Sequence, residues 1–186
     1  MRENTEQIRP PRALWVPFPL GRPFGAPHDP GFQREVVRAA LALLEPGDEV
    51  ILSDPHYACY PNFIRFVQGV PVMIPVSEED GFQFKPEAIS AKITASTRAI
   101  FLNSPSNPTG NLLSAQRMKE IAAIATAADN LYIVSDEIYH GLVYEGREHS
   151  ILEFTDQAFV VNGFSKQFAM TGLRLGYLIA PEAFVR

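Results

Sequence analysis

The chain has 186 residues, 46% hydrophobic and 20% charged, a composition typical of a folded domain with a buried core. A formal net charge of −5 excludes a basic surface for nucleic acid or an anionic membrane, and no apolar run reaches the ~20 residues of a membrane span. Because the start lacks an apolar signal core and Cys59 is the only cysteine, we expect a reduced, cytoplasmic protein without an internal disulfide.

The first part of the chain is rich in proline. Many of the 16 prolines precede residue 31, and this stretch shows neither helical nor strand periodicity. Each proline also removes a backbone donor, so we interpret residues 1–30 as an extended arm or tail. Asp29 and Pro30 then form a helix start, and a helix is predicted over residues 32–45. A single domain is therefore predicted over residues 31–186.

Short apolar strands alternate with helices in that domain. Strands are predicted over residues 49–54, 71–76, 98–103, 131–137, 158–164 and 174–180. Helices are predicted over residues 60–68, 86–93 and 114–129. In the last helix Ser114 is the expected N-cap, and the inner face consists of Met118, Ile121, Ala122 and Ala125. Several strands are apolar on both faces, so the fold class is α/β, a mostly parallel sheet flanked by helices.

Polar clusters occur where the predicted strands end. They occupy residues 54–57, 103–110, 135–140 and 163–166. In open α/β sheets, ligands bind beyond the carboxyl ends of the strands. We therefore expect these four loops to meet at one edge of the sheet and to form a site.

Two positively charged residues near the end of the sequence, Lys166 and Arg174, suggest what kind of ligand the site binds. Lys166 lies among Phe164, Phe168 and other apolar residues, and loss of hydration would lower the pKa of its amine and favour attack on a carbonyl. A lone lysine is more often a solvated surface residue. Arg174 offers a planar, permanently charged group for phosphate, with a structural ion pair as the alternative. Together the two residues suggest a ligand that is a phosphorylated aldehyde.

Four further side chains fit an aromatic ligand of that kind. Asp136 could keep a ring nitrogen protonated, and Tyr139 and Asn107 could hydrogen-bond a ring oxygen. Tyr57 could stack on the ring. Each residue has a plain alternative: a turn cap for Asp136, ordinary loop chemistry for Asn107 and a half-buried tyrosine for Tyr57.

Three segments resemble one known family over about residues 41–184. NSPSNPTG, SDEIYHGLVYEG and GFSKQFAMTGLRLG, which follow one another in this order along the chain, are similar to motifs of the class I/II, fold-type I aminotransferases, which use pyridoxal 5′-phosphate. The resemblance implies a partial cofactor-binding large domain over residues 31–186. It also implies transfer of an amino group between an amino acid and a 2-oxo acid, and a homodimer for an intact family member.

The resemblance also implies a role for each candidate side chain. Lys166 would bind the cofactor aldehyde covalently and then move a proton between the substrate and the cofactor. Asp136 would bind the pyridine nitrogen, and Arg174 would bind the phosphate. Asn107 and Tyr139 would bind the O3′ oxygen of the ring, and Tyr57 would stack on the ring.

The sequence departs from the family pattern in three places. We find no phosphate-cradling loop before residue 45, which weakens the expected phosphate site because backbone donors at a helix start are a main anion-binding device. Gly163 occupies a position where many relatives carry serine. The sequence stops at Arg186, before the segment in which we would expect the family's C-terminal small domain, so we expect a fragment of the family's chain.

Other functions remain open at this point. A pyridoxal-phosphate-dependent lyase would use the same loops, and a non-catalytic remnant would bind little cofactor. A metal hydrolase could use Asp136, Glu137, His140 and His149, although neither HExxH nor a paired-cysteine zinc pattern is present, and our prediction includes no metal. A nucleotide site is weaker still, because neither GxxxxGK[ST] nor GxGxxG occurs.

Overall fold

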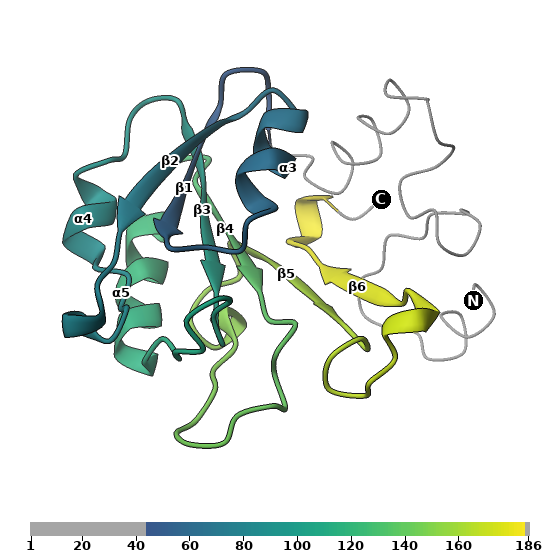
Figure 1. Cartoon of the computed structure of the whole chain (residues 1–186). Coiled ribbons are helices and arrows are strands. Elements are labelled where there is room, and N and C mark those ends of the chain that lie inside the picture. The colour runs from purple at the N-terminus through teal and green to yellow at the C-terminus, as the bar shows by residue number, and fades with distance from the viewer. Residues whose placement is uncertain (1–43, 185–186) are drawn as a thin grey trace.

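A six-stranded sheet with helices on both faces is the frame of the molecule in the computed structural model, which describes residues 44–184 (Figure 1). The predicted arm over residues 1–30 and most of the predicted helix over residues 32–45 lie outside this range. The division of the chain at residue 30 therefore stays a prediction.

The strands confirm the predicted α/β class. They are β1 (Glu49–Asp54), β2 (Val70–Pro75), β3 (Thr97–Asn103), β4 (Tyr132–Asp136), β5 (Ala158–Gly163) and β6 (Gly176–Ile179). Their order in the sheet is β2-β1-β3-β4-β5-β6. All neighbours pair in parallel except β6, which is antiparallel to β5. Each predicted strand lies within two residues of the observed one at both ends.

The helices are shorter than predicted. They are α3 (Tyr60–Phe66), α4 (Pro86–Ser90) and α5 (Ala115–Thr126), accompanied by short 3-10 turns η1 (Glu78–Asp80), η2 (Ile151–Glu153), η3 (Thr171–Leu173) and η4 (Glu182–Phe184). Helix α3 ends early because Gln68 adopts a left-handed φ of 68° and the Gly69 N–H returns to the carbonyl of Ile64. The predicted cap of α5 is confirmed, since the Ser114 side chain accepts a hydrogen bond from the Arg117 N–H at 3.2 Å.

Two apolar clusters hold the layers together, one on each face of the sheet. Helices α4 and α5 cover the first face, where Ile89 and Met118 pack against Ile100 and Ile133. Helix α3 covers the other face, where Ile64 joins a second cluster. Strand residues alternate between the clusters as the pleat requires. The predicted inner face of α5 is confirmed, because all four of its residues are buried.

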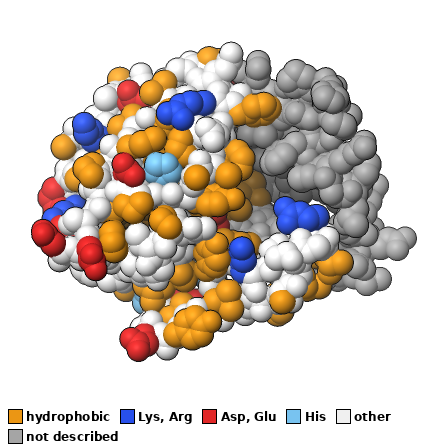
Figure 2. Space-filling view, in the orientation of Figure 1, with side chains coloured by type: hydrophobic (Ala, Val, Ile, Leu, Met, Phe, Trp, Pro, Cys, Tyr) orange, Lys and Arg blue, Asp and Glu red, His pale blue; other side chains and the backbone are white. Residues whose placement is uncertain are grey.

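The surface of the described chain carries dispersed charge. Figure 2 shows acidic and basic side chains scattered among apolar and uncharged ones on the face in view. The most exposed large apolar side chain among residues 44–184 is Tyr144, which is 96% exposed. No helix in this part of the chain has the length and apolarity that crossing a bilayer requires.

The buried centre of the sheet should dominate stability. Ile100 is fully buried on β3, so Ile100→Ala should lower the free energy of unfolding by about 2–5 kcal/mol through lost burial and a residual cavity. Val70 on the edge strand β2 is 45% exposed, and Val70→Ala should change it by less than about 1 kcal/mol. Urea denaturation followed by circular dichroism measures both, and equal losses would contradict the assigned core.

Candidate active site

A pocket of about 370 Å³ opens at the carboxyl edge of the parallel strands. It is lined by Tyr57, Tyr60, Asn107, Asp136, Ile138, Tyr139, Ser165, Lys166, Thr171 and Arg174. The loops that carry these residues follow β1, β3, β4 and β5, and η3 adds the last segment. The structure thus brings together all six residues that the sequence singled out, from segments up to 117 positions apart (57 to 174).

Asp136 is the most buried charged group in this pocket. It ends β4, near the middle of the sheet, and both carboxylate oxygens accept a hydrogen bond. The Tyr60 hydroxyl donates to Oδ2 at 2.6 Å, and the Ile138 N–H donates to Oδ1 at 3.0 Å. Burial raises the pKa of Asp136, and the bonds from Tyr60 and Ile138 offset part of that rise. Each oxygen keeps a second lone pair for a ligand.

Tyr60 is a pocket residue that the sequence analysis missed. It is only 6% exposed, and its ring packs on Phe101 with centroids 4.2 Å apart and edge-on against Tyr57 at 5.3 Å. Burial and then the neighbouring charge of Asp136 raise the pKa of the Tyr60 phenol, so the phenol keeps its proton at neutral pH and acts as the donor. Tyr57 is itself 40% exposed, with part of its ring open to the pocket.

The loop after β3 is tied to the end of β4. The Asn103 side chain accepts from the Asn107 N–H at 2.7 Å and donates to the Asp136 carbonyl at 2.9 Å. The Asn107 side-chain amide then donates to the Tyr139 hydroxyl at 3.1 Å. Asn107 and Tyr139, assigned separately to one ring oxygen, therefore lie within hydrogen-bond reach of each other.

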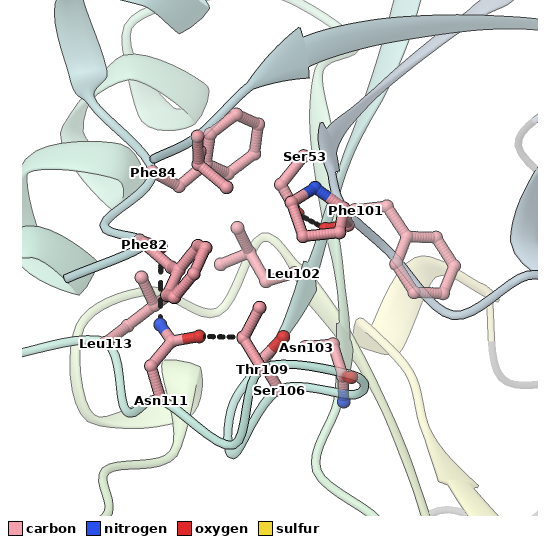
Figure 3. A pocket seen from close by; sticks show the side chains of 12 residues that line it. Ser53, Phe82, Phe84, Phe101, Leu102, Asn103, Ser106, Thr109, Asn111 and Leu113 are labelled. Carbon is pink, nitrogen blue, oxygen red and sulfur yellow. Dashed lines mark hydrogen bonds between the residues drawn. The ribbon is translucent and has the colours of Figure 1, made fainter. Parts of the chain in front are cut away.

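A second, smaller cavity lies behind this loop and shows how the loop is supported. Its volume is about 20 Å³, enough for one water molecule. Figure 3 shows Phe82, Phe84 and Leu102 on its apolar side and Thr109 and Asn111 on its polar side. Asn111 hydrogen-bonds Thr109 and donates to the Phe82 carbonyl at 3.3 Å, and these bonds hold the far end of the loop. We assign this cavity a packing role.

Lys166 and Arg174 lie at the open mouth of the pocket. The expectation that apolar neighbours would remove water from Lys166 is wrong: the residue is exposed, and Phe168 is itself 54% exposed. The physical reason is that Lys166 lies in an irregular segment after β5 in which residues 166–169 are all exposed, so its sequence neighbours do not enclose its amine. The Lys166 amine lies 5.4 Å from the centre of the Tyr139 ring, within cation–π range.

The two cations have no carboxylate partner within residues 44–184. The Arg174 guanidinium donates to the Thr171 carbonyl at 3.0 Å, and no ion pair of either Lys166 or Arg174 is found there. The structural ion pair considered for Arg174 is therefore not formed in this part of the chain. Unpaired positive charge at the mouth is available to an anionic ligand.

Gly163 has little room for a side chain. A Cβ built there would lie 3.0 Å from the Leu175 carbonyl and 3.3 Å from Ile138. A serine at this position, as expected in many relatives, would require β5 and the segment before β6 to separate slightly. The close approach of these two segments instead positions the chain that leads to Arg174.

Glu137 and His140 have structural contacts. Glu137 is 3% exposed, and its Oε1 accepts from the Ser135 and Ser150 hydroxyls at 3.1 and 3.2 Å and from the Ile151 N–H at 3.0 Å. His140 Nδ1 lies 3.5 Å from the other oxygen of Glu137. Within residues 44–184, no three His, Cys, Asp or Glu side chains are grouped to hold a metal ion. These contacts assign Glu137 to anchoring the segment after β4.

The fold and the pocket define an α/β protein with a partly buried carboxylate, Asp136, and two cations without an ion pair in residues 44–184, Lys166 and Arg174, around one cavity. Residues 30–186 match the family "Aminotransferase class I and II". The chain therefore belongs to the class I and II aminotransferase family.

Named relatives support this assignment. The chain is 43% identical over 146 residues to a probable aspartate/prephenate aminotransferase of Thermus aquaticus, covering 78% of this chain and 38% of the relative. It is 38% identical over 159 residues to a bifunctional aspartate aminotransferase and glutamate/aspartate-prephenate aminotransferase of Petunia hybrida, covering 83% and 33%. The chain thus spans between a third and two fifths of the length of these relatives.

Solved structures show the same fold. The aspartate aminotransferase of Thermus thermophilus with maleate superimposes with a TM-score of 0.76 at 39% identity, over 82% of this chain and 40% of that one. An aromatic aminotransferase of Pyrococcus horikoshii superimposes with a TM-score of 0.75 at 36% identity, over 81% and 41%. The described sheet and helices therefore correspond to part of a larger aminotransferase chain.

Glu137 should contribute more to stability than an exposed glutamate. Glu137→Ala leaves buried donors of Ser135 and Ile151 without their acceptor, and should lower the free energy of unfolding by about 3 kcal/mol. Glu120, which pairs with Arg117 on the surface of α5, is the matched control, and Glu120→Ala should cost less than about 1 kcal/mol. Urea denaturation compares them, and a loss below 1 kcal/mol for Glu137→Ala would contradict its anchoring role.

Asp136 should make the cofactor-free protein less stable as pH rises. Because its pKa is raised above 3.8 in the folded state, the native chain binds more protons than the unfolded chain between 3.8 and the folded pKa, so stability falls as pH rises through that window. Asp136→Asn should abolish this fall and leave the protein more stable at pH 7, as measured by melting temperature.

Asp80 serves as the control of opposite sign. The hydrogen bond from Lys85 lowers the pKa of Asp80. The ionised Asp80 side chain therefore stabilises the folded state above pH 3.8, and this stabilisation is lost on acidification. Asp80→Asn should therefore remove a small stabilisation at pH 7. An Asp136→Asn variant that loses stability at pH 7, as Asp80→Asn does, would refute the raised pKa.

Proposed function

We propose that this chain provides the cofactor-binding part of a pyridoxal 5′-phosphate-dependent aminotransferase, which transfers an amino group between an amino acid and a 2-oxo acid. The observation that carries the proposal is one cavity faced by the Lys166 amine, the buried Asp136 carboxylate and the Arg174 guanidinium. The family membership of the chain supports the same reaction class.

The pocket fits pyridoxal phosphate in size and charge. Its volume of about 370 Å³ lies within the ~300–1,000 Å³ range of small-molecule sites. Its inner end is negative through Asp136, and its mouth is positive through Lys166 and Arg174. Pyridoxal phosphate carries a basic ring nitrogen, an aldehyde and a phosphate, and each of these groups finds a complementary side chain here.

Side chains at the inner end would bind and orient the ring. Asp136 would accept a hydrogen bond from the protonated ring nitrogen through a free lone pair. Asn107 and Tyr139 would hold the ring oxygen between them, which their 3.1 Å separation permits. Tyr57, partly open to the pocket, would stack on the ring, and the edge-on contact with Tyr60 fixes its orientation.

Side chains at the mouth would bind the phosphate and move the proton. Pyridoxal phosphate, when bound, supplies an aldehyde that captures amines and a ring that withdraws electrons from the substrate α-carbon. Lys166 would capture the aldehyde, and its amine, once displaced by the substrate, would accept the α-proton. Arg174 would neutralise phosphate charge.

The substrates, partners and location of the whole protein are part of the proposal. The names of the relatives point to aspartate or prephenate as their substrates, so aspartate is the first amino donor to test here. A homodimer is proposed from the family resemblance, and the expected cytoplasmic location stays a prediction. The exposure of Lys166 favours one alternative, a non-catalytic chain that binds cofactor weakly.

The decisive variants change Lys166. Purified chain titrated with pyridoxal phosphate should become yellow with saturation at one equivalent, and Lys166→Ala should lose this absorbance. Lys166→Arg keeps the positive charge without a nucleophilic amine, so it should retain weak cofactor binding without the colour. Lys119→Ala, which changes an exposed lysine on α5, should behave like the unchanged chain.

Two outcomes separate the alternatives. Absence of saturable binding in the unchanged chain supports the non-catalytic alternative, and equal spectra for Lys166→Ala and the unchanged chain remove the covalent role of Lys166. With aspartate added, formation of a 2-oxo acid together with aminated cofactor indicates amino transfer, whereas elimination products indicate the lyase alternative.

A further inference from the structure

Tyr60 contacts Asp136, the carboxylate on which the proposed cofactor chemistry depends. Its hydroxyl lies 2.6 Å from Asp136 Oδ2, a distance typical of a strong hydrogen bond to a charged oxygen. The residue begins α3, where Pro61 occupies the first turn, and its side chain reaches across to the end of β4. The contact joins positions 76 residues apart.

We propose, on the basis of the function proposed above, that Tyr60 is a positioning residue that keeps Asp136 ionised and aimed into the pocket, so that Asp136 can hold the cofactor ring nitrogen in its protonated form. Tyr60 itself does not contact the ring nitrogen in this arrangement. It acts through Asp136.

The packing of Tyr60 explains why the hydroxyl is fixed. Its ring is held between Phe101 of β3 and the edge of Tyr57, and it belongs to the apolar cluster under α3. A tyrosine held in this way loses little conformational entropy when it forms the bond to Asp136. The same ring supports Tyr57, so one residue positions both the group that would bind the ring nitrogen and the group that would stack on the ring.

The electrostatics of the pocket make this donor necessary. A carboxylate as buried as Asp136 tends to take up a proton, and a protonated Asp136 could not stabilise a positive ring nitrogen. Within residues 44–184, its carboxylate oxygens accept hydrogen bonds from the Tyr60 hydroxyl and the Ile138 N–H. The other titratable groups that share the pocket are Tyr57, Tyr139, Lys166 and Arg174, and neither cation forms an ion pair with Asp136.

The test compares Tyr60→Phe with the unchanged full chain, without cofactor. Phenylalanine keeps the ring and its packing and removes only the hydroxyl. With ¹³C-labelled aspartate, carboxyl NMR titration should show Asp136 taking up its proton at a higher pH, with about tenfold greater proton affinity. The Asp136→Asn variant identifies the resonance. Tyr132→Phe, which removes a phenol from the opposite end of β4, should leave the titration unchanged.

A second substitution gives the opposite shift. Incorporation of 3-fluorotyrosine at position 60 preserves the shape and strengthens the hydroxyl as a donor, so Asp136 should release its proton at a lower pH than in the unchanged chain. If Tyr60 only packed against its neighbours, the two substitutions would not shift the titration midpoint of Asp136 in opposite directions. The same titration midpoint in all three chains would overturn the proposal, and the fluorinated chain keeps it testable if Tyr60→Phe does not fold.

Cofactor titration separates this inference from the proposed function. If the unchanged chain binds pyridoxal phosphate, Tyr60→Phe should bind it about tenfold more weakly while Tyr132→Phe binds it normally. Normal binding with an unshifted Asp136 in Tyr60→Phe refutes the role of Tyr60 and leaves the proposed function intact. Absence of binding in the unchanged chain overturns the proposed function, and the effect of Tyr60 on Asp136 is then decided by the cofactor-free NMR titration.

Discussion

A carboxylate buried at the end of a central strand, without a cationic partner in residues 44–184, is the constraint on which the pocket depends. Burial alone would favour a neutral Asp136, yet the group receives a hydrogen bond on each oxygen, from Tyr60 and from the Ile138 N–H. Such an arrangement costs stability in the empty protein and is favourable when a cation binds. The fold thus holds a negative charge in readiness for a positively charged group, which in the proposed function is a protonated ring nitrogen.

The parallel sheet determines what surrounds this charge. Because β1, β3, β4 and β5 run in the same direction, the loops that follow them meet at one edge, and Asn103 ties one of these loops to the end of β4. The positive groups, Lys166 and Arg174, come from the more open region after β5. The result is a pocket that is negative and rigid inside and positive and accessible at its mouth, a distribution that suits a ligand with opposite charges at its two ends.

Much of the fold could be predicted from the sequence because apolar runs and turn residues are local signals. The strands and the cap at Ser114 follow from them, whereas the antiparallel direction of β6 depends on its pairing with β5. At the site, the motifs identified Lys166 and Asp136 without a structure. Tyr60 could not be found in this way, since its bond to Asp136 joins distant positions, and the exposure of Lys166 depends on what covers its loop rather than on its sequence neighbours.

The most direct measurement is the site of covalent cofactor attachment. The chain has four lysines, Lys85, Lys92, Lys119 and Lys166. Borohydride reduction in the presence of pyridoxal phosphate fixes the cofactor to the lysine that binds it, and peptide mass spectrometry then shows which of the four lysines carries it. The account predicts a pyridoxyl group on Lys166 at one equivalent and none on the other three. Labelling spread evenly over the four lysines, or absent from Lys166, would contradict it.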